Sequence, residues 1–569
     1  MKKVKKILSD HKIDGYIIPK NDEYFNEYIE PSKDRLRYIS KFSGSAGFAI
    51  ILKNKNYLFV DGRYTLQAQL QSGKNFDILT LPNKYPGSII KKKYIIGFDP
   101  KLHTERGLKI LFGKTKCVLK PIEKNLIDRI WKRKKTIHVK KFYKLKDKDV
   151  GQSSKKKLKI LSNILKKNKI DLLFVSAAEN IAWLLNIRGR DSDYSPIPNS
   201  YLFVNQKQNV YFFCKKGQID ENLKKKLGNN VILIDINYLK KFILKIKNKK
   251  IYLDSLSCSI FYKNVLKKNN SIIDQQDPIY GLKSIKNKTE IANIKKAHVV
   301  DGIALTKFLI WLKNNYNKKK ITEISAQEKL LKFRKKNKQF KFLSFPTISG
   351  TGPNSSIIHY KANEKSNRIL KKGDLYLVDS GGQYNFGTTD VTRTLSLENR
   401  EKKIKEIFTR VLKGHIAVSN YKLKQNSSGS KVDSAARKFL KKIKLDYPHS
   451  TGHGVGYFLN VHEGPQALSK LNKIKLKEGM VLSNEPGYYK NGKFGIRIEN
   501  LITIKKSKDK LKFEDLTLAP IDKNLINKKL LNKEEIKWLN NYHSKVFFKL
   551  KNHMNGIELK DLKLACSNI

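Results

Sequence analysis

The stretch DSGGQYNFGTTDVTRT, residues 379–394, decides the fold of the region around it. It follows the apolar run LYLV at 375–378, and the strand-forming residues VTRT at 391–394 end it, with a Gly-containing turn between. A hairpin of this kind brings the carboxylates of Asp379 and Asp390 side by side. Because two buried carboxylates lose hydration and repel each other, the pair predicts a bound cation.

The composition indicates a globular protein with several domains. The chain has 569 residues, of which 40% are hydrophobic and 30% are charged, and this length exceeds what one hydrophobic core usually supports. No uncharged apolar run approaches the roughly 18 residues of a membrane span, so we expect no membrane segment. Asp10, His11 and Asp14 interrupt the basic N-terminus, which argues against a secretory signal. Scattered cysteines fit a reducing compartment, and we expect a cytoplasmic protein.

The formal net charge of +68 raises the question of nucleic-acid binding. Lysine supplies most of the excess and is spread through every segment beside Asn and Ile. Arginine, which binds phosphates and base edges better, is sparse. The pattern therefore argues against specific nucleic-acid binding and predicts only weak, salt-sensitive adhesion to polyanions.

The first half of the chain contains an internal repeat. Segments 7–18 (ILSDHKIDGYII) and 164–175 (ILKKNKIDLLFV) resemble each other. Each is typical of a helix end, a turn through Ile-Asp and a buried strand. We therefore predict two related α/β domains, at residues 1–147 and 148–284.

A third region is predicted to begin at residue 285 with a long helix. Asn287 and Glu290 suit a helix start, and apolar residues then recur at helical spacing. His298 and His415 lie within helical patterns, and we interpret both as packing residues rather than ligands. The region is predicted to extend to residue 507, and its glycines, prolines and histidines indicate a site.

The segment after this region is rich in lysine, but its pattern is not that of a disordered tail. Residues 534–547 (EEIKWLNNYHSKVF) have helical periodicity. We therefore predict that residues 508–569 form an ordered cap or interface.

Histidines gather in the segment HSTGHGVGYFLNVHEGP at 449–465, which carries His449, His453 and His462. Glycines around His453 allow the close backbone approach that a ligand or substrate requires. His359 lies in an earlier loop-rich segment, directly after two isoleucines. Three histidines among glycines favour a functional site over isolated packing roles.

Two more carboxylates follow the histidines. Glu485 ends an apolar run at a Pro-Gly turn. In FGIRIEN, strand alternation places Ile496 and Ile498 on one face and leaves Arg497 and Glu499 on the other. An ordinary salt bridge would also explain Arg497 and Glu499, but this alternative weakens once the other carboxylates are counted with them.

These residues together form an oxygen-rich set of ligands with a single imidazole. The set is Asp379, Asp390, His453, Glu485 and Glu499. Its roughly four negative charges would be neutralised by two divalent cations, with Mn²⁺ favoured and Co²⁺, Zn²⁺ or Fe²⁺ as alternatives. Two such ions about 3.5–4 Å apart would activate a water for attack on a carbonyl. The residues therefore predict a hydrolase.

Five motifs stand in the order found in one known family. GTTDVTRT, STGHGVG, NVHEGP, EPGYY and GIRIEN resemble the pita-bread metallopeptidases, and among these the long, cytosolic-type Xaa-Pro aminopeptidases nearly end to end. The resemblance implies two creatinase-like α/β N-terminal domains followed by a pita-bread α+β catalytic domain at 285–507. LTLAPIDKNLI (516–526) resembles the extension of the long form, which here is 508–569.

The resemblance also implies a role for each site residue. The implied metal ligands are Asp379, Asp390, His453, Glu485 and Glu499, with Asp390 and Glu499 bridging two ions. The implied catalytic residues are His359, His462 and Glu485, with Glu485 as proton acceptor and donor. The implied substrate-binding residues are His449, Arg63, Tyr489 and Arg497. Of these, Tyr489 and Arg497 would belong to a hydrogen-bond network that orients the metal ligands. For Arg63, a local ion pair with Asp61 or a turn cap is the simpler explanation.

The implied reaction removes any N-terminal residue that precedes proline. Proline has no N–H and a fixed ring, so a shaped pocket has to recognise it. The implied partners are short peptides and a second copy of the chain in a homodimer. A prolidase, which cleaves only dipeptides, is the nearest alternative, and the chain length and tail argue against it. The complete ligand set argues against creatinase and against non-enzymatic binding proteins of this fold.

Overall fold

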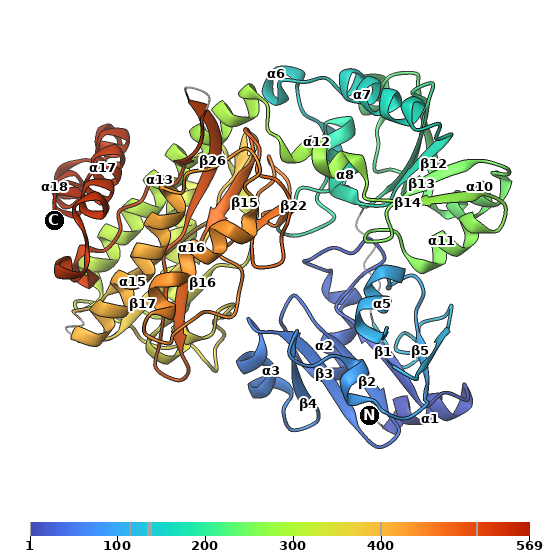
Figure 1. Ribbon diagram of the computed structural model, residues 1–569, viewed down its shortest axis with the longest axis horizontal. Helices are drawn as coiled ribbons and strands as arrows, with labels where there is room; N and C mark the ends of the chain where they lie inside the picture. Colours follow the sequence, from blue (N-terminus) through green and yellow to red (C-terminus); the bar gives the residue numbers. More distant parts are fainter. Residues whose placement is uncertain (1, 114, 134–138, 399–400, 508–509) are drawn as a thin grey trace. The chain divides into compact units, whose positions relative to one another are not determined.

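The computed structural model forms two compact units (Figure 1). The first unit comprises Met1–Asp147 and Gln152–Gly281, and the second comprises Lys148–Gly151 and Leu282–Ile569. The residues that the structure describes are 2–113, 115–133, 139–398, 401–507 and 510–569. None of the helices in these ranges is long and apolar enough to cross a membrane.

The first unit contains two six-stranded sheets with the same strand order. In each, the first strand along the chain lies inside the sheet, with an antiparallel neighbour on one side and a parallel neighbour on the other. One sheet runs β4 (Asp77–Leu81), β3 (Asn56–Asp61), β2 (Phe48–Leu52), β1 (Gly15–Pro19), β5 (Ile95–Phe98) and β6 (Val118–Pro121). The other runs β12 (Val231–Asp235), β11 (Val210–Cys214), β10 (Tyr201–Asn205), β8 (Leu172–Val175), β13 (Lys250–Leu253) and β14 (Ser271–Asp274).

Helices connect and flank these strands. Those of the first unit include α1 (Lys2–Asp10), α2 (Arg35–Ser40), α3 (Thr65–Ser72), α5 (Glu105–Phe112), α7 (Ser154–Lys167), α8 (Ala178–Leu185), α9 (Glu221–Leu227), α10 (Leu239–Lys245) and α11 (Ile260–Lys267). The predicted repeat corresponds to the end of α1 with β1 and the end of α7 with β8. Lys12 and Lys169 occupy equivalent turns and have positive φ angles of 50° and 52°. The returning hydrogen bonds are Ile13 N–H to Leu8 O (3.1 Å) and Ile170 N–H to Leu165 O (2.9 Å). The prediction of two related α/β domains is confirmed.

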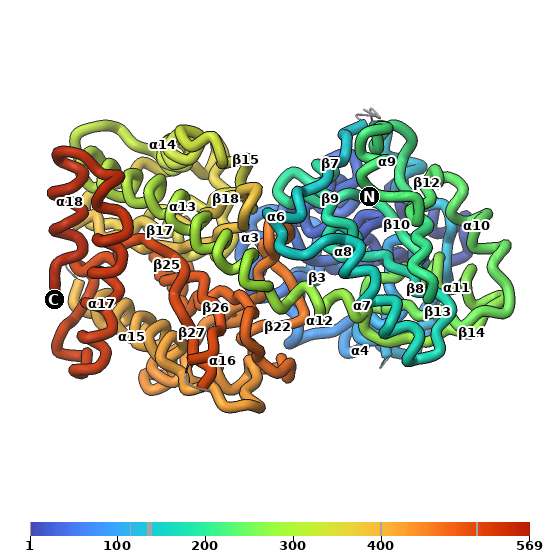
Figure 2. Tube along the Cα trace, turned by 90° about the horizontal axis from the view of Figure 1, so that it is seen from above, coloured from blue at the N-terminus to red at the C-terminus, as the bar shows by residue number. Residues whose placement is uncertain are grey.

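The second unit has two successive groups, each made of a helix pair followed by strands (Figure 2). The helix pairs are α13 (Lys288–Asn315) with α14 (Glu323–Lys335), and α15 (Lys402–Ser419) with α16 (Gly429–Lys441). One sheet runs β16 (Ile348–Thr351), β17 (Leu375–Ser380) and β20 (Val391–Ser396). Another runs β22 (Glu463–Leu468), β21 (Gly452–Gly454), β23 (Val481–Asn484), β26 (Asn500–Ser507) and β27 (Lys510–Asp515).

The helix α13 begins where the sequence predicts a start. Asn287 accepts from the Glu290 N–H at 3.0 Å, and the Glu290 side chain accepts from the Asn287 N–H at 2.9 Å, which satisfies two amides at the helix start. His298 is buried on this helix, and its Nδ1 donates to the Ile294 carbonyl at 2.8 Å. Burial lowers the pKa of His298 to about 4 and that of His415, on α15, to about 3. Both histidines are neutral packing residues, as predicted.

The predicted hairpin of 379–394 is present, but it spans two sheets. Asp379 on β17 lies opposite Thr392 on β20 in an antiparallel pair. Between them, β18 (Gly382–Tyr384) and β19 (Gly387–Thr388) form a second pair that joins β15 (Phe340–Leu343) instead. The chain crosses from one sheet to the other at Gly381, where an added Cβ would lie 1.9 Å from the Thr389 carbonyl oxygen. Only glycine fits this crossing.

The described part of the C-terminal extension, 510–569, is ordered. Strand β27 pairs with β26 at the edge of the larger sheet. The helices α17 (Lys533–Leu550) and α18 (Gly556–Cys566) pack together and against α13, and α17 also contacts α15 (Figures 1 and 2). Asn532 and Glu535 form a capping box at the start of α17. The predicted ordered cap is confirmed for these residues.

Candidate metal centre

The five predicted metal ligands all lie in the second unit, on strands or directly beside them. Asp379 is on β17 and Asp390 directly precedes β20, so the first group of strands supplies two carboxylates. The second group supplies the rest: His453 in the middle of β21, Glu485 directly after β23, and Glu499 between β25 (Phe494–Arg497) and β26. Two separate sheets are therefore needed to assemble the set.

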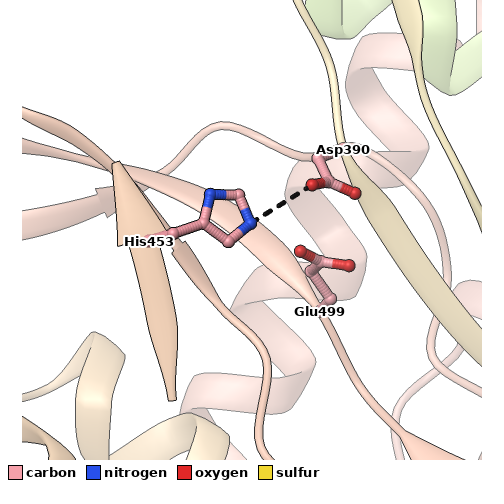
Figure 3. Close-up of side chains that lie close together, drawn as sticks. All are labelled: Asp390, His453 and Glu499. Atoms are coloured by element: carbon pink, nitrogen blue, oxygen red, sulfur yellow. Dashed lines mark ion pairs between the residues drawn. The ribbon is translucent and has the colours of Figure 1, made fainter. Parts of the chain in front are cut away.

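The structure brings the imidazole to the carboxylates (Figure 3). Ligand atoms of Asp390, His453 and Glu499 all lie within 4.8 Å of one another. His453 Nε2 lies 3.5 Å from Asp390 Oδ2 and 3.5 Å from Glu485 Oε1. His453 Nδ1 lies 2.9 Å from the Gly454 carbonyl oxygen. Because a carbonyl only accepts, Nδ1 carries the proton and Nε2 is left as the ligand atom.

Two carboxylates each have one oxygen held by a donor and one oxygen without a partner. Arg497 Nη2 donates to Asp379 Oδ2 at 2.7 Å, and Thr392 Oγ1 donates to Glu499 Oε2 at 2.7 Å. Asp379 Oδ1 and Glu499 Oε1 are buried and have no hydrogen-bond partner among the described residues. Buried polar atoms are almost always satisfied. These two oxygens, with the neighbouring imidazole nitrogen, fit the coordination of divalent cations.

The pKa shifts of the clustered carboxyls also favour a cation site. Burial, reinforced by the charges of Asp379 and Glu485, raises the pKa of Asp390 well above its usual range. Burial and the neighbouring Asp390 do the same for the pKa of Glu499. Burial also raises the pKa of Glu485, although His453 partly opposes this. Burial and mutual repulsion therefore disfavour the negative charge of these carboxyls, and a bound cation would offset that cost.

A chain of hydrogen bonds extends from the ligands to one of the predicted pocket residues. Arg497 is 1% exposed, and its Nη1 donates to the Tyr489 hydroxyl at 2.7 Å. His449 Nε2 lies 2.9 Å from the same hydroxyl, and His449 Nδ1 donates to the Ser450 carbonyl at 2.8 Å. The Tyr489 hydroxyl therefore links Arg497 to His449. Through Arg497, this chain holds the orientation of Asp379.

Ile496 and Ile498 belong to one hydrophobic core cluster, on the face opposite to the site. Arg497 Nε and Glu499 Oε2 both bond to the hydroxyl of Thr392, at 3.0 and 2.7 Å. The alternation predicted for FGIRIEN is therefore confirmed.

The remaining predicted site residues differ in how closely the structure links them to the cluster. The rings of His462 and His453 are 4.4 Å apart between centroids and meet edge to face. His359 follows Ile358, whose carbonyl accepts from Arg497 Nη2 at 3.5 Å. Arg63 lies in the first unit, where its Nη2 is 2.7 Å from Asp61 Oδ2. The structure thus displays the local ion pair, and the substrate role of Arg63 stays a prediction.

Two supporting residues were not singled out from the sequence. Thr392 holds both Glu499 and Arg497, and strand alternation from Asp390 could have placed it on the same face. Thr451 accepts from the Glu485 N–H at 2.8 Å through its carbonyl and donates to Asp433 at 2.6 Å through its hydroxyl. No local pattern distinguishes Thr451, because both partners come from other elements.

Comparison with known families accounts for nearly the whole chain. Residues 292–506 match "Metallopeptidase family M24", and residues 509–569 match the C-terminal region of this peptidase. Residues 1–128 and 133–290 each match "Creatinase/Prolidase N-terminal domain". The fold is that of a pita-bread metallopeptidase with two creatinase-like domains before it in the chain. The chain belongs to metallopeptidase family M24.

Comparison with individual relatives indicates which kind of M24 peptidase this chain resembles. "Probable Xaa-Pro aminopeptidase P" of Laccaria bicolor is 37% identical over 99% of this chain and 92% of its own length. The X-prolyl aminopeptidase of Caenorhabditis elegans, described as a cytosolic enzyme with a di-nuclear active site, has a TM-score of 0.92 at 32% identity and covers 98% of this chain and 95% of that chain. Prolidase from Pyrococcus furiosus covers 98% of its own chain but 63% of this one, with a TM-score of 0.51 at 24% identity, and shares the fold alone. The likeness therefore favours Xaa-Pro aminopeptidases over prolidases.

Proposed function

We propose that this protein is a metal-dependent aminopeptidase that removes the N-terminal residue from peptides with proline in second position. The observation that carries the proposal is the pair of buried oxygens, Asp379 Oδ1 and Glu499 Oε1, which have no hydrogen-bond partner in the described chain and face a cluster of carboxylates with one imidazole. The full-length likeness to Xaa-Pro aminopeptidases supports the substrate class.

The proposed cofactors are two divalent cations, with Mn²⁺ as the preferred ion. Four carboxylates and one imidazole form a hard donor set that suits Mn²⁺ better than a metal that prefers thiolates. The residues that would hold these ions are Asp379, Asp390, His453, Glu485 and Glu499. When bound, such ions lower the pKa of a water molecule and polarise the peptide carbonyl.

The residues of the chain hold the substrate and move the proton. Glu485 is the proposed proton acceptor, because burial raises its pKa towards the range in which a carboxyl can both take and return a proton. His462, packed against His453, and His359 are the proposed contacts to the substrate carbonyl. His449, held by Tyr489, is proposed to line the pocket.

The proposal also covers the domain organisation, the cellular compartment and the oligomeric state of the enzyme. We propose that residues 285–507 are the catalytic domain, preceded by domains at 1–147 and 148–284 and followed by the extension at 508–569. Arg63 of the first domain is proposed to contact the peptide. The enzyme is proposed to act in the cytoplasm, as a homodimer, on short peptides.

A metal analysis paired with a peptide panel tests the proposal. Purified protein should bind two equivalents of Mn²⁺ and release the first residue from an Xaa-Pro-Pro tripeptide, with no release from the matched Xaa-Ala-Pro peptide. Cleavage restricted to Xaa-Pro dipeptides would instead identify a prolidase. Absence of cleavage with Mn²⁺, together with tight RNA binding at physiological salt, would favour a non-enzymatic binding protein.

A further inference from the structure

The arginine of the TRT motif, Arg393, is buried behind the metal centre. It is 1% exposed and lies on β20, three residues after Asp390 and directly after Thr392. All of its hydrogen-bond acceptors in the described chain are uncharged, being backbone carbonyls, an amide and a phenol. A buried guanidinium without a carboxylate partner requires an explanation beyond ion pairing.

One part of this guanidinium holds the strands that carry proposed ligands. Arg393 Nη1 donates to the carbonyl of Glu499 at 2.6 Å and to that of Thr392 at 2.9 Å, and Nη2 donates to Asn500 Oδ1 at 2.9 Å. The Thr392 side chain in turn donates to Glu499 Oε2. The backbone of Glu499 is therefore held by Arg393 and its carboxylate by the preceding residue.

The other part of the guanidinium reaches the C-terminal extension. Arg393 Nε donates to the Pro520 carbonyl at 3.1 Å, and Nη2 also contacts the Ala519 carbonyl and the Tyr542 hydroxyl, both at 2.8 Å. Tyr542 lies on α17 and itself donates to the Ala519 carbonyl at 2.9 Å. Every N–H of the guanidinium thus has an acceptor, and the acceptors come from two separate regions.

Asn500, the residue after Glu499, forms a second connection to the C-terminal extension. The amide of Asn500 donates to Asp515 Oδ1 on β27 at 3.0 Å, and the Tyr542 hydroxyl lies 3.3 Å from Asn500 Oδ1. The ring of Tyr542 stacks on Trp538 with centroids 5.3 Å apart, which fixes the position of the hydroxyl. The extension therefore meets the residue after Glu499 with several directed bonds as well as apolar packing.

We propose that Arg393 and Tyr542 are positioning residues through which the C-terminal extension holds the metal ligand Glu499 in place. The inference rests on the proposed function, because it assumes that Glu499 binds metal. Residues that orient ligands without touching the metal typically change metal affinity by roughly 10–100-fold when they are substituted. An extension that only stabilised the fold would change the unfolding temperature and leave metal affinity alone.

The test compares two substitutions on the same helix of the full-length protein. Tyr542→Phe removes the hydroxyl that contacts Arg393, while Val546→Ala removes buried apolar volume from α17 without a polar contact. The measurements are Mn²⁺ titration by calorimetry, the visible absorption spectrum of Co²⁺ bound to the protein, and the unfolding temperature.

We expect Tyr542→Phe to weaken Mn²⁺ binding about tenfold and to change the Co²⁺ spectrum. Val546→Ala should lower the unfolding temperature and keep the affinity and spectrum of the unaltered protein. Arg393→Lys keeps the charge but loses the forked geometry, so it should weaken binding at least as much as Tyr542→Phe. If Arg393→Lys does not fold, the Tyr542→Phe result decides.

Wild-type affinity and spectrum in Tyr542→Phe would overturn the inference, and so would an equal loss of affinity in Val546→Ala. Unaltered protein that binds two metals and cleaves Xaa-Pro-Pro leaves the proposed function standing in either case. Unaltered protein that binds no metal would overturn the proposed function and this inference together.

Discussion

The second unit buries carboxylates in two places, at Glu463 and in the candidate metal centre. The two places differ in how the negative charge is compensated. Glu463 lies between Lys283 and Lys286, whose ammonium nitrogens are 3.3 and 2.6 Å from its two carboxylate oxygens. All three side chains are 1% exposed. In the metal centre, Arg497 bonds to one carboxylate, Asp379, and the others have no Lys or Arg within ion-pair distance in the described ranges.

The pKa shifts of the two groups have opposite signs. Burial alone would raise the pKa of Glu463, but the two lysines outweigh burial and lower it. Burial and like charges raise the pKa of Asp390 and of Glu499 well above their usual range. A protein can thus bury a carboxylate either by supplying its own cation or by leaving room for one from solution. Glu463 is neutralised by lysines of the chain, and the other carboxylates form the proposed cation site.

The largest expected effect comes from removing a proposed ligand of the cation site. Asp390→Asn should reduce Mn²⁺-dependent cleavage of an Xaa-Pro-Pro peptide by about four orders of magnitude, roughly 5 kcal/mol of activation free energy. The reason is that a neutral amide does not supply the negative charge that the proposed carboxylate ligand offers to a cation. Steady-state kinetics and metal analysis measure the change. Glu463→Gln is the matched control and should retain bound metal. Loss of metal in Glu463→Gln but not in Asp390→Asn would contradict the roles given to these two carboxylates.

Removal of a built-in cation should affect stability instead. Lys286→Met leaves Glu463 buried with one lysine, and we expect a loss of about 3–5 kcal/mol in the free energy of unfolding. Urea denaturation at saturating Mn²⁺ measures it. The double variant with Glu463→Gln should lose less than the sum of the single variants, because the uncompensated charge is then absent. Strict additivity would show that the two side chains do not depend on each other.

Removal of the dissolved cations should have a smaller effect on stability. Chelation should lower the free energy of unfolding by about 2.8 kcal/mol, which is about 1.4 kcal/mol for each of two ions, relative to protein with metal at about ten times its dissociation constant. Thermal or urea denaturation with and without chelator measures this difference. Lys286→Met should show the same difference as the unaltered protein, whereas a clearly different value would indicate that the two acidic groups are coupled.

The smallest expected effect is a pH dependence whose sign differs between the groups. The lowered pKa of Glu463 gives stability that is present above its unfolded value of 4.5 and is lost as the pH falls through the folded value. The raised pKa values of Asp390 and Glu499, from 3.8 and 4.5, give stability that is lost as the pH rises through the folded values. Each group contributes a slope of at most about 1.4 kcal/mol per pH unit.

Metal-free protein provides the measurement of this pH dependence. Metal-free Asp390→Asn should be more stable than metal-free unaltered protein at about pH 8, and the advantage should shrink towards about pH 5. Glu463→Gln should show its greatest loss of stability at neutral pH and a smaller loss in acid. A constant advantage of Asp390→Asn across this range would mean that its carboxyl is not protonated in the folded metal-free state.

Much of the local structure follows from patterns that are visible in the chain. The capping pair of Asn287 and Glu290 starts α13, and the repeated helix, turn and strand around Lys12 and Lys169 produce two equivalent sheets. Alternation along FGIRIEN separates the core isoleucines from the site face. These features depend on backbone geometry over a few residues, and that geometry is encoded in the spacing of apolar and capping residues.

The hairpin at residues 379–394 has a feature that such patterns do not predict. Alternation predicts that Asp379 and Asp390 approach each other, but it does not predict that the intervening strands belong to another sheet. That division depends on Gly381, which allows a carbonyl from a neighbouring segment to approach where a side chain would otherwise stand. The approach is a packing event between strands, and the identity of one glycine does not specify which strand will come close.

The sequence by itself determined the ligand types, the duplicated leading domains, the helix starts and the membership of the family. Only the tertiary structure decided that Glu463, adjacent to His462, is neutralised by lysines while Glu499 Oε1 is buried without a hydrogen-bond partner in the described chain. It also decided that Arg393 joins the extension to the strand carrying the site. The physical reason is that periodicity reports which face a side chain occupies, whereas compensation of a buried charge depends on atoms brought from distant elements within about 3 Å.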